Sequence, residues 1–213
     1  MKQLLMVAVI SLLSLLFFAD TSMAKLIDEH IYIVPVGQID KKTTEGVKNG
    51  FSGFMPMSVR VEISQPKDVP QAAYDSSRKQ YNAETVLYEI SQRMTIDIMT
   101  ERVLVITDVD LYAPGSDFVL GSANAKKGIC IISLARLKKD DKLFLERVSK
   151  QAIYEFGVSR GLDNCSNLKC VMNSSNNLAD IDKKKHALCH DCRNNLLHRY
   201  VNPLFNASLK SLI

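Results

Sequence analysis

The chain has 213 residues, of which 46% are hydrophobic and 23% are charged, and its formal net charge is +4. This composition is globular and excludes a disordered chain, because the apolar fraction is large enough to form a core. The small net charge, the absence of tryptophan and the lack of a basic run longer than Lys183, Lys184 and Lys185 argue against a nucleic-acid-binding protein.

The first 24 residues have the pattern of a cleavable signal peptide. A lysine precedes an apolar run over residues 4–19, and Ser22 and Ala24 form a Ser-x-Ala cleavage site before Lys25. The apolar run is shorter than the ~20 residues that a membrane span needs, and an uncleaved anchor is the alternative. The sequence therefore predicts an exported chain, secreted or periplasmic, with one mature domain over residues 25–213.

The mature chain is predicted to adopt a mixed α/β (α+β) fold. Runs that are rich in β-branched residues or alternate between polar and apolar residues predict strands at residues 31–37, 58–63, 102–112 and 128–137. Helical spacing of apolar residues predicts a helix at residues 83–94 and a long helix at about residues 143–161. The order of these elements indicates one domain with a mixed twisted sheet and packed helices.

Four of the five cysteines lie in two close pairs near the C-terminus. Their spacing is Cys165-x4-Cys170 and, after eighteen residues, Cys189-x2-Cys192. Such pairs are typical of structural zinc sites, because each tight turn directs two thiolates toward one edge of a tetrahedron. We therefore expect one zinc ion that ties the end of the long helix to the C-terminal segment. Two disulfides are the alternative, which an oxidising compartment favours. Cys130, within a predicted strand, is expected to be a buried apolar residue.

Two short motifs around these cysteines carry a family resemblance. CSNLKCVMN contains Cys165, Cys170 and Met172, and CHDC contains Cys189 and Cys192. With this spacing the chain resembles the archaemetzincins, a branch of the metzincin zinc proteases, and residues 74–87, 106–123 and 132–137 are similar to the same family. The resemblance implies a metzincin-like domain with a long active-site helix, a C-terminal segment bound by a four-cysteine zinc site, and Met172 in a turn beneath the helix.

The resemblance fails at the catalytic metal site that it implies. Where the family has its three zinc-binding histidines, this chain has Tyr154, Val158 and Asn164. Glu155 matches the glutamate that acts as general base, and Gly161 matches the glycine at which the chain leaves the helix. Valine offers no lone pair, asparagine is a weak oxygen donor, and tyrosine binds a metal as phenolate. Without the metal no water is activated, so we expect a catalytically inactive pseudo-metalloprotease.

Two functions remain open at this point. An inactive chain that keeps the metzincin groove would bind a peptide or protein along an edge strand, which the resemblance places near residues 128–137. The alternative is an active zinc-dependent peptidase whose metal site is rebuilt with Tyr154 and Glu155. In the inactive chain we expect Glu155 to be an ordinary helix residue and Val158 to fill a collapsed pocket.

Overall fold

The computed structural model describes residues 28–51, 54, 58–137 and 142–210. The predicted signal peptide and its cleavage site lie outside the described residues. Within the described ranges, no helix is both long and apolar enough to cross a lipid bilayer.

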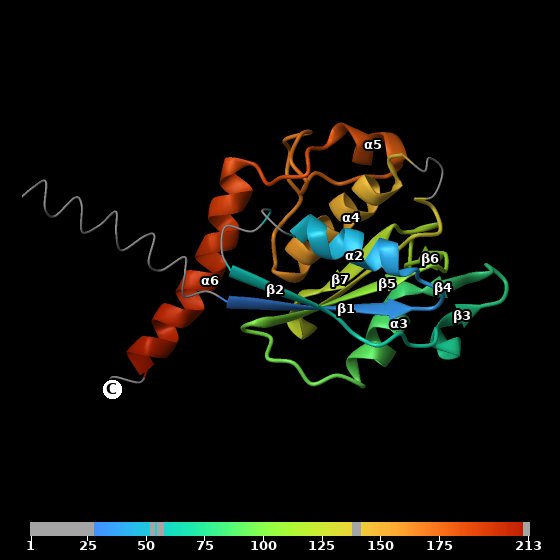
Figure 1. Ribbon diagram of the computed structural model, residues 1–213, viewed down its shortest axis with the longest axis horizontal. Helices are drawn as coiled ribbons and strands as arrows, with labels where there is room; N and C mark the ends of the chain where they lie inside the picture. The colour runs from blue at the N-terminus through green and yellow to red at the C-terminus, as the bar shows by residue number, and fades with distance from the viewer. Residues whose placement is uncertain (1–27, 52–53, 55–57, 138–141, 211–213) are drawn as a thin grey trace, which may run out of the picture.

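A five-stranded mixed sheet forms the centre of the domain (Figure 1). Across the sheet the strands are β2 (Ser58–Ile63), β1 (Asp28–Val36), β5 (Glu101–Thr107), β8 (Ile129–Ser133) and β7 (Gly121–Asn124). The first four are parallel, whereas β7 runs antiparallel to β8 and forms one edge. A second, small sheet contains β3 (Tyr74–Asp75), β4 (Gln80–Asn82) and β6 (Leu111–Tyr112).

Helices cover both faces of the large sheet, which explains why its central strands are apolar almost throughout. On one face, alternate residues of β1, β5 and β8 pack against α2 (Lys41–Phe51) and α4 (Phe144–Ser159). On the other face, the intervening residues pack against α3 (Ala83–Ser91), whose N-cap residue Asn82 accepts a hydrogen bond from the Thr85 amide. Two single-turn 3₁₀ helices, Gln71–Ala73 and Ala125–Lys127, precede β3 and β8.

Two further helices follow α4 and enclose the cysteine-rich region. They are α5 (Leu178–Lys183) and the long C-terminal helix α6 (His190–Lys210). In Figure 1, α5 lies above α4, and α6 lies at the side of the sheet where β1 and β2 begin. The second cysteine pair therefore stands at the start of α6, close to the end of α4.

The predicted elements are confirmed with somewhat different bounds: β1 begins earlier than expected, α3 and α4 end earlier, and β2 matches the expected residues. The strand expected at residues 102–112 is divided into β5 and β6, because Asp108 and Asp110 lie in the turn between them. The expectation that residues 128–137 form the edge strand is wrong, since β8 lies between β5 and β7. The edge is β7, whose residues GSAN are small or polar and lack the pattern that identifies a strand from sequence.

Candidate functional site

The end of α4 brings the two candidate metal sites together. The helix stops at Gly161, whose φ of +81° is in the left-handed region that favours glycine. The Leu162 amide donates back to the Gly157 carbonyl at 2.9 Å, which closes the helix end. The chain then turns away, so that Asn164 and Cys165 lie beside the helix and not beyond it.

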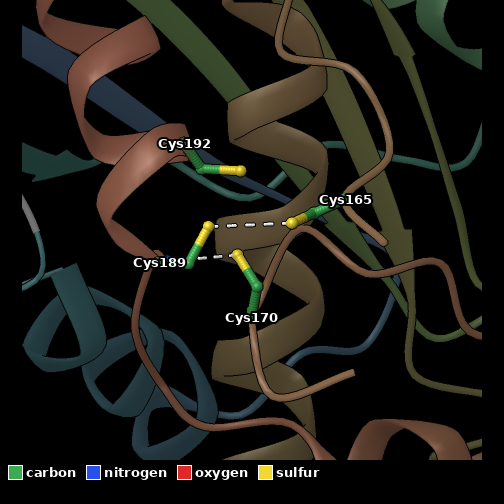
Figure 2. A group of neighbouring side chains, drawn as sticks. All are labelled: Cys165, Cys170, Cys189 and Cys192. Atoms are coloured by element: carbon green, nitrogen blue, oxygen red, sulfur yellow. Dashed lines mark hydrogen bonds between the residues drawn. The ribbon is translucent and has the colours of Figure 1, made fainter. Parts of the chain in front are cut away.

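The four clustered cysteines converge on one point between α4 and α6 (Figure 2). Their four Sγ atoms all lie within 4.8 Å of one another, and all are free thiols. The Sγ atoms of Cys165 and Cys189 are 3.7 Å apart. A disulfide needs about 2.05 Å between sulfurs, so this pair is not bonded.

This donor set fits a zinc ion. With Zn–S bonds of about 2.3 Å, two sulfurs along one edge of a tetrahedron are about 3.8 Å apart, close to the separation of Cys165 and Cys189. The backbone amide of Cys189 also donates to Cys170 Sγ at 3.2 Å, an interaction that favours a thiolate there. The four predicted cysteines therefore form a preformed cluster that fits a zinc ion. Cys130 is fully buried elsewhere in the core, as predicted.

The three positions at which the resemblance implies zinc-binding histidines behave differently from these thiols. Tyr154 Oη donates a hydrogen bond of 2.6 Å to Asn164 Oδ1. Two oxygen ligands on one tetrahedral zinc are about 3.3 to 3.6 Å apart. The Tyr154 and Asn164 oxygens are therefore too close together to bind the same zinc ion, and they form a hydrogen bond with each other instead. Val158, one turn after Tyr154, presents only methyl groups to the same space.

The tyrosine also stays neutral. Burial, followed by the charge of Glu155, raises the pKa of Tyr154 to about 12. A protonated phenol is a hydrogen-bond donor and a poor metal ligand. The Lys184 ammonium group lies over the face of the Tyr154 ring, 4.7 Å from its centroid, in a cation–π contact.

Glu155 lies on the sheet side of α4, almost fully buried, with 4% of its surface exposed. Its Oε1 accepts a hydrogen bond of 2.9 Å from Gln151 Nε2, one helical turn earlier. Gly121 of β7 makes room for it, because a Cβ there would overlap Glu155 Oε1 and the Ile131 carbonyl. Burial raises the pKa of Glu155 to about 8, against the opposing effects of Gln151 and Lys184.

Lys184 is a component of the site that the sequence did not predict. Its side chain is buried with 4% exposed, and its Nζ donates to the Val171 carbonyl at 3.2 Å. Burial lowers its pKa to about 8, an effect that Glu155 and Cys170 oppose. Lys184 follows two other lysines, and nothing in that run distinguishes the buried one from its exposed neighbours.

Met172 lies directly beneath α4, where the resemblance places the methionine turn. It is fully buried, and a Cβ at Gly157 would collide with its Sδ. The Cys165 amide donates to the Met172 carbonyl at 2.9 Å, and Asn173 Nδ2 donates to the Cys165 carbonyl at 2.6 Å. The turn is thus held to both the helix and the cysteine cluster.

A pocket of ≈ 470 Å³ remains between α4 and β7. Its walls are residues 116–121, which lead into β7, one side of α4, and residues 174–176 after the methionine turn. Tyr154, Glu155 and Val158 all line it, whereas Asn164 does not. The expectation of a collapsed pocket is therefore wrong, although Val158 does pack against the core as expected.

Comparison with known proteins assigns the chain to a family. A family model described as peptidase family M54 matches residues 47–198. The chain belongs to this family, the archaemetzincins. An archaemetzincin from Natronomonas pharaonis is 34% identical over 178 residues, covering 79% of this chain and 99% of that protein. Another from Pyrococcus furiosus is 35% identical, covering 79% and 93%.

Solved archaemetzincin structures share the fold described above. The archaemetzincin from Archaeoglobus fulgidus, solved in complex with malonate, has a TM-score of 0.68 and 34% identity, covering 78% of this chain and 98% of that one. That from Methanopyrus kandleri has a TM-score of 0.69 and 31% identity, covering 80% and 95%. A zinc-dependent peptidase from Methanocorpusculum labreanum has a TM-score of 0.70 and 27% identity, covering 78% and 99%. The predicted archaemetzincin membership and mixed α/β fold are thereby confirmed.

Proposed function

We propose that this chain is an exported archaemetzincin that has lost peptidase activity and binds an extended peptide or protein segment. One structural zinc ion in the four-cysteine cluster would shape the end of α4 and the methionine turn. The pocket beside that turn would be the place of binding. Export rests on the signal-peptide pattern of the first 24 residues.

The hydrogen bond between Tyr154 and Asn164 carries the proposal of inactivity. It joins two of the three positions at which the family resemblance implies zinc ligands, and the third position holds Val158. Peptide hydrolysis by such a site requires a metal-activated water, and Glu155 alone supplies neither the lowered water pKa nor the Lewis acid. This donor set does not fit a catalytic zinc ion.

The arrangement of β7 and the pocket supports peptide binding. β7 is an edge strand, so one side of its backbone is available to pair with an added strand. The pocket opens next to its first residue, Gly121, and would accept a side chain of a peptide lying along that edge. Main-chain pairing would supply affinity, and the pocket would supply selectivity.

One observation favours the rebuilt peptidase as a second candidate. Glu155 still lines the pocket, and its pKa near 8 is in the range of a general acid or base at neutral pH. The neutral, hydrogen-bonded state of Tyr154 weighs against it, because the rebuilt site needs this residue as a phenolate ligand.

Cleavage of a degenerate peptide library, with the zinc-loaded protein and added zinc, separates the two functions. We expect no turnover above background for the wild type or for Glu155→Gln. Turnover by the wild type that Glu155→Gln abolishes would contradict the proposal of inactivity. Binding of the same peptides without cleavage, measured by fluorescence anisotropy, is the result that we expect.

A further inference from the structure

The pocket beside α4 is acidic although the chain as a whole is basic. The formal net charge is +4, yet the exposed Asp117 lines this pocket and no lysine or arginine does, within the described part of the chain. Glu155 also lines it, but burial raises its pKa to about 8, so its carboxyl is mostly neutral at pH 7. The pocket near the N-terminal ends of β5 and β8 is the opposite case, with Lys126 and Lys127 in its wall. The local balance of charge therefore favours a positively charged ligand at the α4 pocket.

A buried polar atom with no partner supports the same conclusion. Gln151 lines the pocket with 4% of its surface exposed. Its Nε2 donates to Glu155, while its Oε1 has no hydrogen-bond partner among the described residues. Ser175 Oγ, in the part of the wall formed by residues 174–176, is also buried without a hydrogen-bond partner among the described residues. A buried polar atom without a hydrogen bond destabilises the fold, so both oxygens are suited to accept hydrogen bonds from a ligand.

The neighbouring cations do not neutralise these groups by contact. Lys184 is held by the Val171 carbonyl and the Tyr154 ring, and it is absent from the pocket lining. Within the described residues, Glu155 forms no ion pair. Arg78 donates to the main-chain oxygens of Ser116 and Asp117 and likewise does not line the pocket.

We infer that this pocket binds the side chain of a lysine or arginine residue in the peptide proposed above. The Gln151 and Ser175 oxygens would accept hydrogen bonds from the cationic group, and the exposed Asp117 carboxylate would supply opposite charge. An ammonium group has three donors and a guanidinium five, and both lack acceptors, which matches a wall of acceptors. The inference rests on the proposed function, since it names the kind of peptide that the groove selects.

Three labelled peptides test this selectivity: an alanine-flanked peptide with lysine, norleucine or glutamate at its centre. Binding to the zinc-loaded full chain is measured by fluorescence anisotropy. We expect the lysine peptide to bind at least about tenfold more tightly than the norleucine peptide, as a charge-assisted hydrogen bond would give. The glutamate peptide should bind most weakly.

A pair of charge-removing variants controls the comparison. Asp117→Asn should reduce the lysine-to-norleucine ratio about threefold or more, because it removes an acidic group from the wall. Asp68→Asn removes another exposed aspartate, one that does not line the pocket, and should leave the ratio unchanged. An Asp117→Asn variant with the wild-type ratio would overturn the inference.

The remaining outcomes separate the inference from the function on which it rests. Equal binding of all three peptides, or tightest binding of the glutamate peptide, would overturn the cationic selectivity and leave peptide binding intact. If none of the peptides binds, the proposed function fails. A titration with n-butylammonium, followed by the NMR shift of the Gln151 side-chain amide, then decides the inference: a shift weakened in Asp117→Asn supports a cation pocket, and no shift overturns it.

Discussion

At the scale of single residues, the buried carboxyl of Glu155 makes the stability of the fold depend on pH. Burial raises the pKa of its carboxyl to about 8 from an ordinary value of 4.5, although Gln151 and Lys184 both favour the ionised form. The folded chain therefore holds this proton more tightly than the unfolded chain. Stability from this group is complete below about pH 4.5 and is lost as the pH rises toward 8.

Replacing Glu155 with glutamine should remove this pH dependence. The amide cannot ionise, so between pH 5 and 8 the free energy of unfolding should fall more steeply for the wild type than for Glu155→Gln, by up to about 1.4 kcal/mol per pH unit. Urea unfolding at several pH values measures the difference. Parallel pH profiles for the two proteins would show that Glu155 is already ionised in the folded state at low pH. Glu146→Gln, an exposed glutamate on the same helix, is the matched control.

Contact between Gly157 and Met172 can be tested by a double-mutant cycle. In the wild type, Gly157→Ala should cost about 1 to 3 kcal/mol, because the new Cβ overlaps a fully buried thioether. In a Met172→Ala background the same change should be neutral or stabilising, since alanine favours a helix over glycine by about 1 kcal/mol. Thermal or urea unfolding gives both values. Equal costs in the two backgrounds would contradict the contact.

At the scale of secondary-structure elements, α4 and the turn after it contain the three positions at which the family resemblance implies zinc ligands. The helix spacing places Tyr154 and Val158 one turn apart on one face. The turn at Gly161 returns Asn164 to within hydrogen-bond distance of Tyr154. The backbone therefore brings Tyr154 and Asn164 close together, as a shared ligand site at the implied positions would require.

Restoring three histidines should restore a second metal site. The combined variant Tyr154→His, Val158→His and Asn164→His is expected to bind two zinc ions per chain where the wild type binds one, because imidazoles at these positions would converge. Elemental analysis after dialysis gives the count. The single variant Tyr154→His serves as control and should stay near one. A count of one for the triple variant would show that the three positions do not share a metal.

At the scale of the whole molecule, the cysteine cluster joins segments that the sheet does not hold. Cys165 and Cys170 follow α4, whereas Cys189 and Cys192 stand at the start of α6. The segment between the pairs contains the methionine turn and α5. Metal binding at these thiols would therefore stabilise the whole C-terminal third against unfolding.

Loss of one cluster cysteine should release the zinc and destabilise the domain. For Cys192→Ser we expect zinc content to fall from about one to near zero per chain. The melting temperature should fall with it, by about 2 to 4 °C for each kcal/mol lost. Cys130→Ala, at the buried cysteine outside the cluster, should keep its zinc. Unchanged zinc content in Cys192→Ser would contradict the four-cysteine zinc site. In the wild type, cysteines that can be alkylated only after a reductant is added would favour disulfides instead.

Export predicts a new N-terminus. If the signal peptide is cleaved as its pattern indicates, the mature protein recovered outside the cytoplasm should begin at Lys25. N-terminal sequencing or intact mass measures this directly, and Ala24→Arg, which places a bulky charge at the cleavage site, should block processing. Recovery of the full-length chain from the cytoplasm alone would refute export.

Sequence patterns were sufficient to locate an element where its residue types or its hydrophobic period are typical of only one kind of structure. The apolar runs located β1, β5 and β8, the helical period located α3 and α4, and the cysteine spacing located the zinc cluster. Short elements without such a pattern were missed or misplaced: β7 consists of small residues, and α5 is six residues long. Gln151 and Lys184 gave no pattern either, because their roles depend on neighbours far along the chain.

The sequence by itself determined the family, the fold class and the four thiols that converge. These follow from local patterns and residue spacing, which do not depend on the residues that line the pocket. Only the tertiary structure showed how the residues at the implied ligand positions are arranged. The hydrogen bond from Tyr154 to Asn164, the open pocket beside β7 and the buried lysine behind Tyr154 all arise from distances between segments. Such distances are fixed by packing, which no local pattern in the chain records.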